Sequence, residues 1–173
     1  MQSNLKKLIE RAKQLNKKVW NATFPSVENR YFCEIERNLK ILLPNDFIKL
    51  TSHISYECSN FVQFLIVNVD ADDIDGIIKN NLELRKEFAE YSAGKSDMSH
   101  ILVLADDDGG SVFMITQDSP DKQTPIIWCD AGDMYWYSID GKFPHPHDEW
   151  PSFSDFFEYL VEQEEKKLEE DEN

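Results

Sequence analysis

The sequence predicts an α+β fold with a mostly antiparallel central sheet, flanked by N-terminal, middle and C-terminal helices. Apolar residues recur every three or four positions near both ends and in the middle of the chain, which indicates amphipathic helices. Between residues 100 and 139, short apolar and β-branched runs alternate with loops that contain Gly, Pro, Asp and Ser. Strands joined by such short connections pair antiparallel, so this order of elements favours α+β over a βαβ repeat.

The predicted helices cover residues 4–18, 32–43, 45–50, 70–91 and 152–163. Pro44 separates the second from the third, because proline disfavours the α conformation of the preceding residue and suits the first turn of a new helix. Asp70 is the expected N-cap of the middle helix, and Ser152 or Ser154 that of the last one. Past Gln163 the apolar stripe gives way to an acidic run, which is either an extension of the last helix or a solvated tail.

The predicted strands cover residues 61–67, 100–105, 111–117, 125–130 and 134–139. The second and third flank a polar turn that ends in Gly109 and Gly110, and glycine reaches the positive-φ conformations of a tight turn at little steric cost. This stretch therefore predicts a β-hairpin, and we expect the sheet to be built around it.

The 173 residues suit a single domain, and the formal net charge of −15 is distributed unevenly. Residues 1–50 hold 10 Lys and Arg against 5 Asp and Glu, a net charge of +5, so the remainder carries −20. Such a surface repels nucleic acids and anionic membranes and attracts a basic protein, or it serves solubility alone. The basic face of the first helix has three interpretations: a surface that contacts another molecule, a solvated face, or a surface that pairs with the acidic remainder of the same molecule.

The sequence favours a cytoplasmic protein. No apolar run is long enough for a transmembrane helix, and the first residues lack the apolar core of a signal peptide. Cys33, Cys58 and Cys129 are odd in number, widely spaced and free of a CxxC motif, so we expect reduced thiols. The oligomeric state stays open between a monomer and a weak dimer.

Catalytic motifs are missing from the sequence: it has no GxSxG, no GxxxxGK[ST], no GxGxxG after a strand and no HExxH. His145 and His147 are two positions apart through a proline, which favours a solvated loop over a zinc site. Asp106–Asp108 do not match the alternating ligands of an EF-hand loop, and they form a simple turn or an acidic knob that faces a partner. The hypothesis of an enzyme therefore rests on no specific motif, and we expect neither a metal nor a cofactor.

A binding role has more support, because aromatic side chains lie among acidic ones. Aromatic residues dominate protein-binding hot spots, while charges steer the approach of the partner. Alternate members of residues 134–139 could instead be core, and both interpretations can hold on opposite faces of a strand. The candidate partner-binding residues are Asp106, Asp107, Asp108, Asp130, Asp133, Tyr135, Trp136, Tyr137, Asp140, Asp148, Glu149 and Trp150.

Four dispersed motifs give the chain a resemblance to a known family. The first is a helix followed by a Leu-Pro step at residues 35–47, and the second is a pair of strands around an Asp/Gly-rich turn at residues 101–115. The third is a strand with a tryptophan and an acid at residues 125–130, and the fourth is the Ser-Phe helix of residues 152–160. In this order and spacing the chain resembles the SUKH superfamily, which includes bacterial toxin-immunity proteins and a fungal regulator of cell-wall synthesis.

The resemblance implies a non-catalytic α+β domain that binds a protein, in bacteria a polymorphic toxin with nuclease or similar activity. We divide the chain into an N-terminal amphipathic helix and loop (residues 1–30), a SUKH-like domain (31–162) and an acidic tail (163–173). The expected function is neutralisation of a cognate, basic, nuclease-like toxin domain through the acidic and aromatic surface, with neither nucleic acid nor membrane as a partner. The alternatives are a regulatory or scaffold protein that binds cellular proteins, and a metal-dependent hydrolase.

Overall fold

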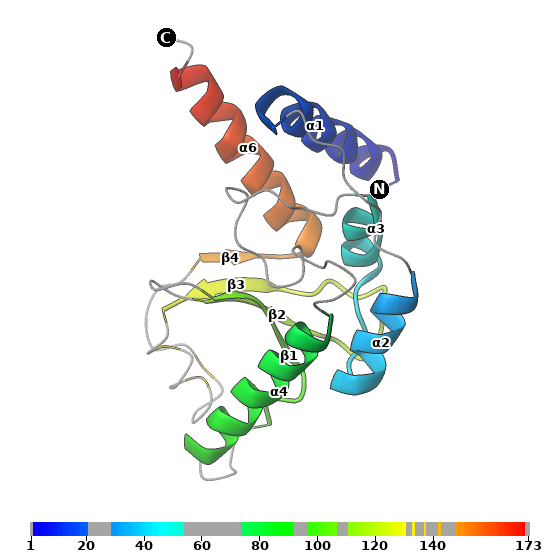
Figure 1. Cartoon of the computed structure of the whole chain (residues 1–173), viewed down its shortest axis with the longest axis vertical. Helices are drawn as coiled ribbons and strands as arrows, with labels where there is room; N and C mark the ends of the chain where they lie inside the picture. The colour runs from blue at the N-terminus through cyan, green and yellow to red at the C-terminus, as the bar shows by residue number, and fades with distance from the viewer. Residues whose placement is uncertain are drawn as a thin grey trace.

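The computed structural model describes residues 2–20, 29–53, 74–91, 97–106, 111–130, 133, 137, 142 and 148–171. Five helices lie within them: α1 (Gln2–Trp20), α2 (Asn29–Leu39), α3 (Asn45–His53), α4 (Ile74–Tyr91) and α6 (Phe153–Asp171). Four strands form one sheet: β1 (Ile101–Asp106), β2 (Ser111–Ile115), β3 (Ile126–Cys129) and β4 (Asp148–Trp150). The predicted α+β fold is confirmed (Figure 1).

The sheet is antiparallel throughout, and its strands lie in the order β1-β2-β3-β4. The predicted hairpin is present: Ile101 pairs with Ile115 at its open end, and Asp106 pairs with Ser111 beside the turn. Figure 1 shows that α6 begins beside β4 and then rises away from the sheet, while α4 lies on the β1 side, where its Asn81 and Arg85 side chains bond to β1.

The last strand of the sheet differs from the prediction. The pattern predicts a strand over residues 134–139, but Tyr137 is helical, and so is Asp133 just before this stretch. Six residues are too few for apolar periodicity to separate a strand from a turn of helix. The last strand is instead β4, which pairs with β3 and is only three residues long. The predicted strand over residues 61–67 lies outside the described residues.

The two faces of the sheet bury different apolar clusters, because successive residues of a strand point to opposite faces. On one face Leu102, Met114 and Ile126 join a large core to which all five described helices contribute. On the other face Val103 and Phe113 belong to a smaller cluster, against which two side chains of α4 pack. The sheet therefore lies between two layers of apolar contacts.

Side chains of α4 bind the outer edge of β1. Asn81 is 1% exposed; its amide donates to the Val103 carbonyl (3.3 Å) and accepts from the Val103 N–H (2.8 Å), as a neighbouring strand would. Arg85 donates to the carbonyls of Ile101 and Leu39, each at 2.7 Å, and burial lowers the pKa of its guanidinium. The bonds to Val103 and Ile101 satisfy backbone groups that an exposed edge strand offers to other chains, and the bond to Leu39 ties α4 to the end of α2.

Helix α1 packs on the main core and on α6. Its buried apolar side chains are Leu8, Ile9, Ala12 and Leu15. Arg11 donates to both carboxylate oxygens of Glu165, at 3.1 and 2.7 Å, and to Glu158 at 3.2 Å. Of the three roles predicted for the basic face of α1, pairing with the acidic remainder of the same molecule is the one these contacts support.

The acidic run after Gln163 continues the last helix, since α6 extends to Asp171. Glu164 is buried and accepts a hydrogen bond from Lys167 at 2.7 Å, and Leu168 packs against the main core. At the other end of α6, Ser152 and Asp155 cap each other: the Asp155 N–H donates to Ser152 Oγ (3.2 Å), and Ser152 Oγ donates to the Asp155 carboxylate (2.6 Å).

None of the helices in the described part of the chain combines the length and the apolar character that a membrane span needs.

Candidate partner-binding surface

Three of the predicted acidic segments meet at one end of the sheet. Asp106 ends β1 at the hairpin turn, and Asp130 follows the last residue of β3. Since β4 runs antiparallel to β3, its first residue, Asp148, lies opposite Trp128 near the end of β3. Asp130 and Asp148 are exposed, and so is Glu149. Strand pairing thus brings acidic residues that are far apart in the sequence to one end of the sheet, which we call the acidic end of the sheet.

One exposed aromatic side chain lies at this end of the sheet and a second lies beyond β4 on α6, and the sequence prediction missed both. Trp128 is 37% exposed and shares a face of the sheet with Trp150, because Trp128 pairs with Asp148 and Ile126 with Trp150. Tyr159 of α6 is 40% exposed, and its ring centroid lies 5.2 Å from that of Trp150. We call Trp128, Trp150 and Tyr159 the aromatic row.

The aromatic row rests on the main core. Trp150 is half-buried, and its ring meets the buried ring of Phe156 at a centroid distance of 4.8 Å and an angle of 60°. One signal for Tyr159 was present in the sequence, because this residue lies off the apolar stripe of the last helix and next to Glu158. For Trp128 no comparable signal exists, since strand alternation alone does not say how far the helices cover a face.

The strands and the helix that carry the aromatic row are rich in carboxylates. Residues 126–130 and 148–163, which form β3, β4 and the first turns of α6, contain no Lys or Arg. Their six carboxylates belong to Asp130, Asp148, Glu149, Asp155, Glu158 and Glu162. Glu158 is paired with Arg11 of α1, which also interacts electrostatically with Glu162. The surface therefore presents a negative potential to an approaching partner.

Two of the predicted site residues lie toward the interior. Asp133 is 5% exposed, and its N–H lies 3.1 Å from both the carbonyl oxygen and Oδ1 of Asp130. Tyr137 is half-buried; its ring lies 6.3 Å from that of Phe113, and its hydroxyl lies 3.3 Å from His100 Nε2. Burial raises the pKa of the Tyr137 hydroxyl. The Tyr137 ring therefore packs against the smaller apolar cluster, while Asp133 is a buried carboxyl group beside Asp130.

The remaining predicted site residues lie outside the described part of the chain. They are Asp107, Asp108, Tyr135, Trp136 and Asp140. Of Asp106 the structure describes the backbone position at the end of β1. His145 and His147 likewise lie outside the described residues. Within the described ranges, no three His, Cys, Asp or Glu side chains come together in a way that could hold a metal ion.

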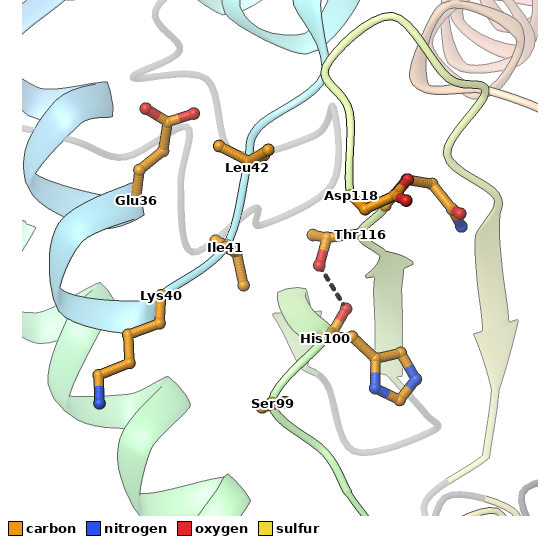
Figure 2. Close-up of a pocket in the computed structure, with 9 residues that line it drawn as sticks. Glu36, Lys40, Ile41, Leu42, Ser99, His100, Thr116 and Asp118 are labelled. Carbon is orange, nitrogen blue, oxygen red and sulfur yellow. Dashed lines mark hydrogen bonds between the residues drawn. The ribbon is translucent and has the colours of Figure 1, made fainter.

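A groove of about 470 Å³ lies at the opposite end of the hairpin, between the end of α2 and the turns at residues 99–100 and 116–118. Its polar groups hold the chain in place: Glu36 accepts from the Leu43 N–H (2.9 Å), and Thr116 Oγ1 donates to the His100 carbonyl (2.7 Å). Figure 2 shows that the side chains of Lys40 and His100 point away from one another. The groove therefore lacks the convergent polar groups typical of a small-molecule site.

Taken together, the chain is an α+β protein whose antiparallel sheet is enclosed by helices and carries an acidic, aromatic surface at one end. Its residues 29–159 match the model of the SMI1 / KNR4 family (SUKH-1), and the chain belongs to this family. The predicted resemblance to the SUKH superfamily is confirmed. Membership supports a protein of immunity or regulatory type in general. No curated protein and no solved structure matches the chain.

The matched segment leaves out most of the contact between the two ends of the chain. Helix α1 precedes residue 29, and α6 continues beyond residue 159 to Asp171. Arg11 and Glu165, which form the two-pronged ion pair between these helices, both lie outside the match. Helix α1 and the part of α6 after residue 159 therefore lie outside the matched segment.

Proposed function

We propose that this protein is a non-catalytic immunity-type protein that binds a cognate bacterial toxin domain and neutralises it. The partner is a basic, nuclease-like domain. One observation carries the proposal: the acidic end of the sheet combines the exposed carboxylates of Asp130 and Asp148 with the exposed indole of Trp128, and the exposed Glu149 adds its charge from the opposite face of β4. Aromatic anchors within an acidic surround supply both the contact energy and the steering that a basic partner needs.

Two magnitudes make the proposal reasonable. A potential of one sign can raise association rates roughly 10- to 1000-fold at low salt. A stable interface needs about 800 Å² from each partner. The acidic end, β4 and the outer face of α6 together offer a surface on which such an interface can be built. A nuclease whose active site is basic would be blocked by this surface in the place of its nucleic-acid substrate.

The experiment uses the full chain and the toxin domain encoded beside its gene, with binding kinetics measured at low and high salt. We expect the association rate to fall steeply as salt rises, because the attraction between exposed charges is screened. The triple variant Asp130→Asn, Asp148→Asn, Glu149→Gln should associate at least 10-fold more slowly than the wild type at low salt. Association that is independent of salt would contradict the proposal.

A matched control separates the acidic end from net charge. Glu83, Glu87 and Glu90 are exposed on α4, along the opposite edge of the sheet. Their conversion to Gln also removes three negative charges. We expect it to lower the association rate by a smaller factor than the triple variant at the acidic end does.

If no toxin gene is adjacent and the protein instead captures a cellular protein, the regulatory alternative holds. Saturable binding of Zn²⁺, Mn²⁺ or Ca²⁺ in calorimetry would instead support the hydrolase alternative.

A further inference from the structure

The aromatic row places ring surface beside carboxylates on α6. Tyr159 has Asp155 four positions before it and Glu162 three positions after it, and residues at these spacings are neighbours on one side of a helix. All three side chains are exposed. A cationic side chain that lies on the Tyr159 ring therefore has a carboxylate within reach on either side.

The same combination recurs on the sheet. Trp128 pairs across the β3–β4 ladder with Asp148, so the exposed indole and the exposed carboxylate are direct cross-strand neighbours. Trp150 lies diagonally from Trp128 on the same face and contacts Tyr159, which makes the row continuous from the sheet to the helix. Two pairs of ring and carboxylate thus flank one half-buried tryptophan.

We propose that the aromatic row is the contact site for arginine side chains of a basic protein partner. An arginine guanidinium is planar and weakly hydrated, so it stacks on an aromatic ring while its N–H groups reach a neighbouring carboxylate. A lysine ammonium is a strongly hydrated point charge, for which the carboxylates alone would suffice. A second copy of this chain would bring the same carboxylates to the contact and be repelled. The inference rests on the proposed function for the existence of a basic partner, and it adds the chemistry of the contact.

The experiment measures binding of capped hexa-arginine and hexalysine peptides to the full chain by calorimetry at low salt. We expect hexa-arginine to bind at least 3-fold more tightly than hexalysine. Trp128→Leu and Tyr159→Leu keep apolar bulk but remove the ring faces, and each should weaken hexa-arginine binding about 2- to 5-fold. The variants Trp128→Phe and Tyr159→Phe keep a ring face, so each should bind hexa-arginine more tightly than its Leu counterpart.

Tyr91→Leu is the matched control, because Tyr91 is an exposed aromatic residue (54%) at the end of α4, on the β1 side of the sheet. It should leave the affinities for both peptides within 2-fold of the wild type. Far-UV circular dichroism checks that each variant is folded, and Tyr159→Leu alters only a partly exposed helical position. Equal affinity for the two peptides, or equal losses for the Leu and Phe variants, would overturn the inference.

The two proposals fail separately. If the toxin is neutralised in a salt-dependent manner while the Leu variants bind hexa-arginine like the wild type, the arginine contact is wrong and the proposed function stands. If hexa-arginine binding depends on the rings but the adjacent toxin is not bound, the proposed function is wrong and the arginine contact stands.

Discussion

Asp46, at the start of α3, accepts two hydrogen bonds from Ser154, at the start of α6. Its Oδ2 receives the Ser154 backbone N–H (2.9 Å) and the Ser154 hydroxyl (2.7 Å), across a sequence separation of 108 residues. Its Oδ1 receives the N–H of Phe47 (2.9 Å). Beside it, Phe47 meets Phe153 edge-on, with ring centroids 4.7 Å apart. The Leu-Pro motif and the Ser-Phe motif are thus two halves of one tertiary contact.

This contact predicts that Asp46→Ala destabilises the protein by about 1–3 kcal/mol, because it leaves N–H groups at the starts of two helices without their acceptor. The measurement is urea denaturation followed by circular dichroism. Asp118→Ala is the control, since Asp118 is exposed and forms a surface ion pair with Lys122, and it should leave the midpoint nearly unchanged. Equal midpoints for the two variants would contradict this role of Asp46.

The edge of β1 gives a second prediction. Asn81→Leu keeps the volume of the side chain but leaves the Val103 N–H and carbonyl without partners, and we expect a loss of about 2–4 kcal/mol. The amide proton of Val103 should exchange with solvent faster in the variant, as measured by NMR. Asn80→Leu is the matched control at the adjacent, exposed position of α4, and it should have little effect on either measurement. Slow Val103 exchange in Asn81→Leu would show that another group protects this edge.

A third prediction concerns the ion pair between α1 and α6. Arg11 and Glu165 are each about one-third exposed, so screening by solvent limits the contribution of their pair to about 0.5–1 kcal/mol. Arg11→Gln should lower the unfolding free energy by this amount at low salt and by less at high salt. Lys13→Gln, at an exposed position of the same helix, is the control. A double-mutant cycle with Glu165→Gln isolates the pair, and a coupling free energy near zero would rule out the ion pair as a clamp.

A fourth prediction follows from the buried thiol of Cys129. Burial raises its pKa from 9.0 to about 12, and the carboxylates of Asp133 and Asp130 act in the same direction. The folded state thus favours the protonated thiol. The stability that the Cys129 thiol contributes is fully present below about pH 9 and is lost as the pH rises toward 12. The unfolding free energy should therefore fall in this range by up to about 1.4 kcal/mol per pH unit.

The variant Cys129→Ala checks this assignment, because it should show a smaller decrease between pH 9 and 12 than the wild type. Part of the decrease will remain, since burial also raises the pKa of Tyr137. Alkylation with iodoacetamide gives an independent measurement: mass spectrometry should find the exposed Cys33 modified well before the buried Cys129. Modification of Cys129 at the rate of Cys33 in the folded protein would contradict the raised pKa.

Much of the fold could be predicted from local patterns. The apolar spacing in residues 4–18 and 45–50, Pro44 and the Gly109-Gly110 turn signal each describe a segment whose own residues decide its structure. The strand predicted over residues 134–139 was wrong at Tyr137, which is helical. The three-residue strand β4 carries no periodic signal, because it is a strand only through its pairing with β3.

The sequence by itself determined the helices, the hairpin, the family and the uneven distribution of charge, because each is recorded in neighbouring residues or in motif order. Only the tertiary structure decided that Asp106, Asp130 and Asp148 share one end of the sheet with Trp128. It also decided that Trp150 connects this end of the sheet to Tyr159 of α6. The physical reason is that strand register and helix packing are set by contacts between segments far apart in the chain. Periodicity shows that a side chain faces inward or outward, but the exposed area of Trp128 depends on where the helices end.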